Sequence, residues 1–89
     1  DSGIPEEKPF LAVDGEGHVY VTDPGYYRVL VFDQDGNYLL SFGEYGTDAQ
    51  SFALPQGIAV GPDGSIYVTD AHGHRVLVFD PIDFGPFEE

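Results

Sequence analysis

The sequence contains no cysteine, no methionine and no tryptophan, and only 3 of its 89 residues are lysine or arginine. Without cysteine, no disulfide framework can compensate for the small core that a chain of this length builds. No apolar run approaches the roughly 18–20 residues that a membrane-spanning helix needs, and no signal-peptide pattern is present. The chain begins at Asp1 without a methionine, so we expect a processed product or a piece of a longer protein.

Charge is strongly one-sided, with 16 aspartate and glutamate residues and a formal net charge of −13. A field of this sign repels nucleic-acid phosphates and anionic lipid surfaces. We therefore expect neither nucleic-acid binding nor membrane insertion. The simplest interpretation of the acidic surplus is solubility, and a requirement for divalent cations at subunit contacts is the alternative.

What the chain does contain is a repeat. Val19–Asp33 returns as Ile66–Asp80 at a constant offset, because 70 − 23, 75 − 28 and 80 − 33 all equal 47. In the ungapped alignment of residues 11–33 with residues 58–80, 13 of 23 positions are identical. Each copy consists of two short apolar runs joined by a polar turn, which is typical of a β-hairpin. A repeat of this period predicts units that must pack against neighbours to bury their apolar surface.

The first unit has the pattern of a four-stranded meander, with Asp35-Gly36 as a strong hairpin signal. The second unit has no such turn after Asp80, and the prolines that follow cannot donate hydrogen bonds to a strand ladder. We therefore expect four strands in the first unit, three in the second, and no helix. The expected strands are Phe10–Val13, His18–Thr22, Arg28–Phe32, Tyr38–Phe42, Gly57–Val60, Ser65–Thr69 and Arg75–Phe79.

This pattern divides the chain into five segments. They are an extended leading segment (1–9), the first unit (10–42), a polar loop (43–56), the second unit (57–80) and a C-terminal docking tail (81–89). Nothing within the chain requires the tail, so we expect it to dock on a neighbouring chain through Ile82, Phe84 and Phe87.

Two strands, Val29–Phe32 and Val76–Phe79, are apolar on both faces. A strand with one wet face would alternate apolar and polar residues. Two stacked sheets leave two such apolar faces in contact with water. At roughly 25 cal/mol per Å2 of apolar area, the burial energy lost in this way is several kcal/mol. This loss is comparable with the whole stability of a small domain. We therefore predict self-association, with an unpaired edge beside Arg75–Phe79 open to strand addition. The residues expected at contacts between chains are Val29, Val31, Val76, Val78, Phe79, Ile82, Phe84 and Phe87.

Charged and aromatic residues gather at the turns. Asp23 with Arg28, and Asp70 with Arg75, flank the same turn in both units, so we expect structural ion pairs that hold the hairpin. Further aromatic side chains in the loops can serve either as contact anchors or in local packing. They are Tyr26, Tyr27 and Tyr45.

His72 and His74 are the one pair with metal-ligand chemistry, because residues i and i+2 of a strand share a face. No third ligand stands at a known spacing, and His18 can join only through a tertiary contact. The segment Asp33–Asn37 has its glycine in the fourth position, unlike a calcium loop, and is better explained as a hairpin turn. No catalytic constellation is present, so we expect no metal site, no cofactor and no enzymatic activity.

The two units resemble NHL repeats, the blades of certain β-propellers. In the second unit the matching residues are Pro55–Val60, Asp63-Gly64, Ile66–Asp70, His74-Arg75-Val76 and Val78-Phe79-Asp80. In the first unit they are Leu11–Val13, Tyr20–Asp23, Arg28-Val29 and Val31–Gly36. Departures from the pattern occur at the hairpin turn, where Gly73 replaces the usual asparagine and Tyr26-Tyr27 replaces asparagine and histidine.

The resemblance implies an all-β fold of two four-stranded antiparallel propeller blades, the second of them incomplete. Such blades come about six to a ring, so we expect completion by self-assembly, either as a closed ring of three copies or as an open filament. The expected function is that of a non-enzymatic structural protein whose partner is itself, in an extracellular or cell-surface setting. The alternatives are a fragment of a larger extracellular propeller that binds a ligand or partner, and a metal-dependent lyase or lactonase.

Overall fold

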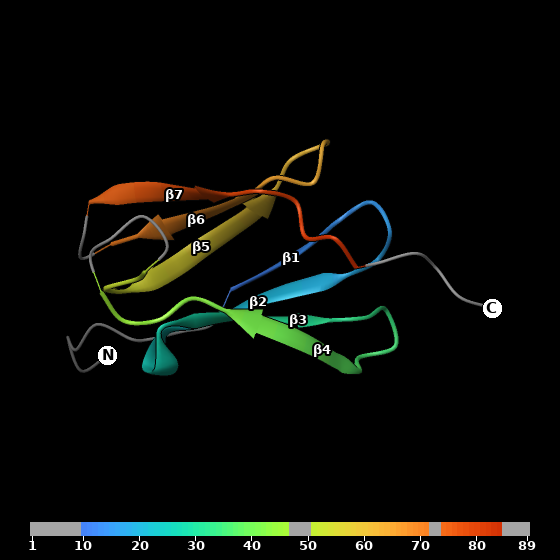
Figure 1. Cartoon of the computed structure of the whole chain (residues 1–89), viewed down its shortest axis with the longest axis horizontal. Coiled ribbons are helices and arrows are strands. Elements are labelled where there is room, and N and C mark those ends of the chain that lie inside the picture. The colour runs from blue at the N-terminus through green and yellow to red at the C-terminus, as the bar shows by residue number, and fades with distance from the viewer. Residues whose placement is uncertain (1–9, 47–50, 72–73, 85–89) are drawn as a thin grey trace, which may run out of the picture.

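The computed structural model describes residues 10–46, 51–71 and 74–84 of the chain. Seven strands form two antiparallel sheets that lie as two layers (Figure 1). The strands are β1 (Leu11–Val13), β2 (Val19–Asp23), β3 (Arg28–Phe32), β4 (Tyr38–Phe42), β5 (Pro55–Val60), β6 (Ile66–Asp70) and β7 (Arg75–Phe79). The predicted all-β fold, with four strands followed by three, is confirmed.

The strand bounds follow the apolar runs closely. β3, β4 and β7 begin and end where the sequence predicts, and the others shift by one or two residues. The expectation of no helix needs one correction, because Pro24–Tyr26 forms a 3₁₀ turn, η1, between β2 and β3. Proline suits the first position of such a turn, since its φ angle is already helical.

The two sheets end differently. In the first sheet, Asp33 turns the chain back, because its carboxylate Oδ1 accepts hydrogen bonds from the backbone N–H groups of Asp35 and Asn37. The returning segment becomes β4, which pairs with β3. After β7 the chain runs on from Asp80 to Phe84 without forming a strand. The second sheet is therefore β5–β6–β7 in the part of the chain that the structure describes.

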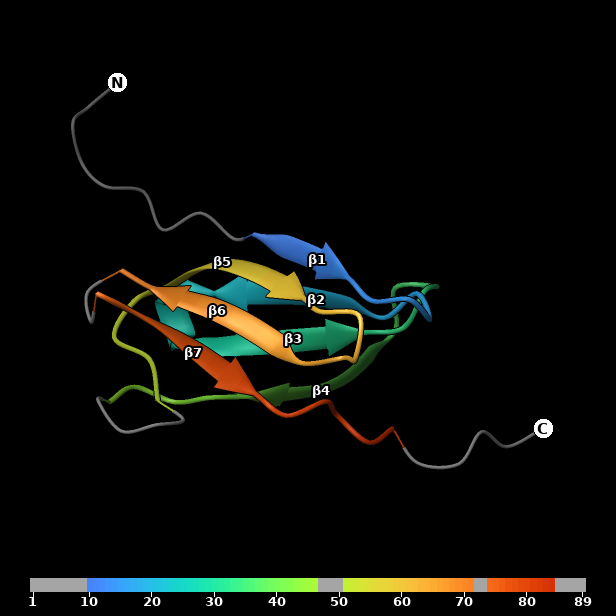
Figure 2. The same cartoon turned by 90° about the horizontal axis from the view of Figure 1, so that it is seen from above.

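The core lies between the two sheets, where one lies over the other in Figure 2. The fully or almost fully buried apolar side chains are Tyr20, Val29, Val31, Phe52, Ile66, Val68 and Leu77. Val29 and Val31 belong to the set expected at contacts between chains, and this part of the prediction is corrected. Both point toward the second sheet of their own chain and have no exposed surface.

The segment between the sheets contributes a core residue of its own. Phe52 is completely buried, with its ring 5.6 Å from that of Phe79. Gly43 makes room for it, because a Cβ atom there would stand 2.3 Å from the Phe52 ring. Gly43 also has a φ angle of +99°, which favours glycine. The linker thus joins the two sheets and seals one end of the core.

Candidate interaction surfaces

Strand register shows that the two sheets use opposite faces for their mutual contact. The first sheet turns one set of side chains inward, which we call its tyrosine face: Tyr20, Thr22, Val29 and Val31. Adding 47 gives the tyrosine face of the second sheet: Tyr67, Thr69, Val76 and Val78. The residue types are the same at all four positions, yet the second set points outward.

The opposite faces show the same reversal. The second sheet packs against the first through what we call its leucine face: Ile66, Val68, Leu77 and Phe79. The equivalent leucine face of the first sheet points away from the core: Val19, Val21, Leu30 and Phe32. Three of these four positions carry the same residue type, and the fourth exchanges valine for isoleucine.

The exposed fractions of equivalent side chains differ strongly between the two tyrosine faces. Tyr20 is 2% exposed, whereas Tyr67 is 42% exposed. Val31 has no exposed surface, whereas Val78 is 59% exposed. The contact inside the chain therefore joins a tyrosine face to a leucine face. The second tyrosine face is exposed, and the second leucine face, on the outer side of the first sheet, is half-buried.

Each hairpin turn carries the aspartate and arginine singled out in the sequence. Arg28 Nε lies 3.0 Å from Asp23 Oδ2 at a partly exposed site, and the Arg28 guanidinium also lies 5.1 Å from the centre of the Tyr26 ring. In the second unit, Arg75 Nε lies 3.6 Å from Asp70 Oδ2, and the Asp70 side chain is completely buried.

Asp70 also fastens the linker to the second sheet. Its carboxylate accepts hydrogen bonds from the backbone N–H groups of Ala53 and Leu54, at 2.9 and 2.8 Å. Arg75 Nη2 donates to the carbonyl oxygen of Ser51 at 2.9 Å. Sequence reasoning did not assign these linker contacts, because backbone groups carry no sequence signal. These contacts join the linker to the second sheet of the same chain.

A second network holds the first loop and the tail. Burial raises the pKa of Asp14, but four hydrogen bonds to its carboxylate lower it by more. Two of them come from the backbone N–H groups of Glu16 and His18, and two from the Tyr20 hydroxyl and the His18 ring. The pKa of Asp14 therefore lies below its ordinary value. Burial, followed by the bond to Asp14, raises the pKa of Tyr20. The ring of Phe84 stacks on His18 with the centroids 3.8 Å apart.

The tail residues expected to dock on another chain need a further correction. Ile82 and Phe84 pack against the core of their own chain. Phe87 lies outside the described residues. Among the loop aromatics, Tyr27 and Tyr45 pack edge to face at 4.7 Å, so local packing describes them. Tyr26 is 72% exposed.

Of the histidine pair considered for a metal, His72 lies outside the described residues, whereas His74 is exposed at the turn before β7. Within the described ranges, no three histidine, aspartate or glutamate side chains gather closely enough to hold a metal ion. The same residues include no helix that is long and apolar enough to cross a membrane.

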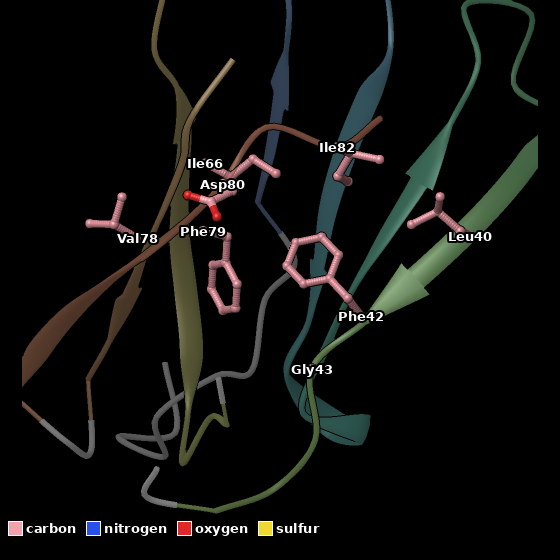
Figure 3. Close-up of a pocket in the computed structure, with 8 residues that line it drawn as sticks. All are labelled: Leu40, Phe42, Gly43, Ile66, Val78, Phe79, Asp80 and Ile82. Carbon is pink, nitrogen blue, oxygen red and sulfur yellow. The ribbon is translucent and has the colours of Figure 1, made fainter. Parts of the chain in front are cut away.

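An apolar groove lies between β4 and β7, beside the edge of the second sheet. It has a volume of about 350 Å3 and is lined by Leu40, Phe42, Gly43, Ile66, Val78, Phe79, Asp80 and Ile82. Figure 3 shows the rings of Phe42 and Phe79 side by side between the two strands, with their centroids 5.0 Å apart. The sequence predicted an unpaired strand edge beside Arg75–Phe79. It did not predict the groove, because the groove depends on how the two sheets stack.

Comparison with known proteins identifies the second unit. Residues 52–79 match the family model of the NHL repeat, and no curated protein matches the chain. The matched segment contains β5, β6 and β7 and begins at the buried Phe52. In the first sheet, β1, β2 and β3 have the same order, and the central hairpin has the same register. The chain therefore carries a match to the NHL repeat at residues 52–79, and its first sheet repeats the strand order and the central-hairpin register of the matched segment.

Proposed function

We propose that this chain is a non-enzymatic structural protein whose copies pack blade against blade. The exposed tyrosine face of one copy meets the outward, half-buried leucine face of the next. The observation that carries this proposal is the reversal of the two faces, because the two outward faces have nearly the same residues as the two faces that pack inside the chain. A contact between copies can thus use the same side-chain packing.

The free energy of such a contact is large for a molecule of this size. Burying a valine or leucine side chain contributes roughly 1.5–3 kcal/mol, and each tyrosine face carries two valines and a tyrosine. Part of this gain offsets the translational and rotational freedom that association removes. Because the two faces differ, the contact is head to tail. It closes into a ring if the rotation per chain fits and continues as a filament if it does not.

Electrostatic repulsion opposes this contact. Each copy carries a net charge of −13, and exposed charges interact over about 10 Å at 0.1 M salt and over shorter distances at higher salt. We therefore expect association to strengthen as the salt concentration rises. Divalent cations are expected to act at lower concentrations than sodium, and an extracellular or cell-surface setting would supply both kinds of ion.

Light scattering on the isolated chain tests the proposal. We expect a mass that rises with protein concentration above the 9.7 kDa of one chain. Val76→Asp places a charge in the exposed tyrosine face and should abolish the rise. The matched control is Gly15→Asp, which adds the same charge at a loop position where a Cβ atom meets nothing within 4 Å, and it should associate like the unmodified chain. A folded chain that stays at one mass at every concentration and salt level contradicts the proposal.

A further inference from the structure

The outer edge of β7 has no strand beside it in the described part of the chain. β7 (Arg75–Phe79) is the last strand of its sheet, whereas the equivalent β3 pairs with β4. The chain cannot fill the place through Asp80–Phe84, since Phe84 stacks on His18. A strand edge of this kind presents backbone N–H and C=O groups to any extended segment that approaches it.

Beside this edge, the groove of about 350 Å3 offers a place for side chains. Leu40 and Phe42 reach it from β4, Phe79 reaches it from β7, and Ile82 reaches it from the segment that follows β7 (Figure 3). Asp80 is the charged residue of the lining, and it is exposed. Within the described residues, the site thus combines the outer edge of the last strand of a sheet, an apolar hollow and a carboxylate.

The first sheet shows which residues such a strand would place in the groove. There, Phe32 pairs with Tyr38, with the rings 6.0 Å apart, and Leu30 pairs with Ser41. Adding 47 to Phe32 and Leu30 gives Phe79 and Leu77, which face the first sheet. A strand that joins β7 in the register of β4 therefore directs an aromatic residue toward Phe79 and a small residue toward Leu77.

We propose that the groove between β4 and β7 is a docking site for an extended segment of a partner protein. The segment adds to β7 as an antiparallel fourth strand and places an aromatic side chain against Phe79. Asp80 and the net charge of −13 select a segment with a basic residue beside the aromatic one. The groove lining shares Val78 with the exposed tyrosine face, and β7 also carries Val76 of that face. A test of docking therefore needs a variant that blocks stacking from outside β7.

A labelled peptide that copies residues 36–43 and carries two added lysines is the probe. Fluorescence anisotropy measures its binding to the Tyr67→Asp chain, in which a charge on β6 blocks the exposed tyrosine face without altering β7 or the groove lining. Failure of stacking and failure of docking are then distinguishable. We expect saturable binding that weakens at least tenfold when aspartate replaces the residue that corresponds to Tyr38 in the peptide. Absence of binding overturns the proposal.

Variants of the chain locate the binding site. Leu40→Glu puts a charge into the groove and should weaken binding at least tenfold, and Ile82→Glu serves the same purpose if the first variant does not fold. Asp80→Lys should weaken binding severalfold at low salt and less at high salt, whereas Gly15→Asp should leave binding unchanged. Weakening by Val21→Asp without weakening by either groove variant would place the peptide on the leucine face and overturn the proposal.

Hydrogen exchange distinguishes strand addition from side-chain contact alone. Bound peptide should slow exchange of those backbone amides of Arg75–Phe79 that point away from β6. Unchanged exchange at these amides with peptide bound overturns the strand-addition geometry.

Discussion

The two units of this chain carry nearly the same residues in different surroundings. Val31 and Val78 occupy equivalent positions in the two tyrosine faces, yet the first is buried between the sheets and the second is 59% exposed. Asp23 and Asp70 likewise occupy equivalent positions, and only Asp70 is completely buried. The residue type does not determine these differences. The position of each sheet within the stack determines which copy is covered, so matched substitutions in the two units measure the contribution of the surroundings.

The largest difference is expected at the hairpin aspartates. Asp70→Asn should lower the free energy of unfolding by about 3 kcal/mol, because it removes the charge of a completely buried carboxylate that lies 3.6 Å from Arg75 and disturbs two hydrogen bonds to the linker. Asp23→Asn, at a site that is 25% exposed, should cost about 1 kcal/mol or less. Urea unfolding of both variants measures the difference. Equal losses would show that burial does not distinguish the two turns.

The valine pair should show a smaller difference that depends on concentration. Val31→Ala removes fully buried methyl groups and should cost about 2 kcal/mol at every protein concentration. Val78→Ala should cost about 0.5 kcal/mol or less in dilute solution, as is usual for an exposed side chain. At concentrations where the chains associate, its cost should approach that of Val31→Ala. Thermal unfolding over a hundredfold range of concentration tests this, and a concentration-independent Val78→Ala would contradict stacking through this face.

Acid should weaken the first unit through a residue that the second unit lacks. Asp14 corresponds to Gly61 in the second unit, and its pKa is lower in the folded chain than in the unfolded chain. The stability that Asp14 contributes is therefore complete above its ordinary pKa of about 3.9 and is lost as the pH falls through its lower folded-state pKa. Asp14→Asn should flatten the fall in melting temperature between pH 5 and pH 2. The lowered pKa values of Asp33 and Asp63 act in the same direction and remain in the variant.

The smallest effect is expected at the end of each hairpin turn. Tyr27 and His74 are equivalent residues, and both have positive φ angles, 59° and 52°. A non-glycine residue in this region carries a cost of about 1 kcal/mol. His74→Gly should therefore stabilise the chain by about 0.5 kcal/mol after the entropy cost of glycine is included. Tyr27→Gly should give no gain, because it removes the contact with Tyr45. Denaturant midpoints report both values.

Much of the fold could be predicted from the sequence, because the apolar runs and the Asp-Gly turn determine strands locally. The repeat predicted two equivalent sheets, and the missing turn after Asp80 predicted three strands in the second. Which face of Val29–Phe32 is buried could not be predicted, since both faces are apolar and the choice depends on the neighbouring sheet. For the same reason, Val29 and Val31 were assigned to contacts between chains.

The groove and the linker contacts could not be predicted either, because both depend on how the two sheets stack. Phe52 is an apolar residue of a polar loop, and nothing in the sequence indicates that it fills the end of the core. The backbone partners of Asp70 lie 16 and 17 residues away in the chain, and no local pattern connects them. The sequence also led to a wrong prediction for Ile82 and Phe84. Nothing in the sequence required the tail to pack within the chain, so these residues were expected to contact a neighbouring chain. In the structure both pack against the core of their own chain.

Mixing two complementary variants tests the central claim of head-to-tail stacking most directly. Val76→Asp blocks the exposed tyrosine face, and Val21→Asp blocks the outward leucine face, so each variant retains one usable face. Sedimentation should show each variant alone at the 9.7 kDa of one chain and the equimolar mixture at twice this mass, with no larger species. Dimers of either variant alone, or a mixture in which both folded variants remain single chains, would contradict the account.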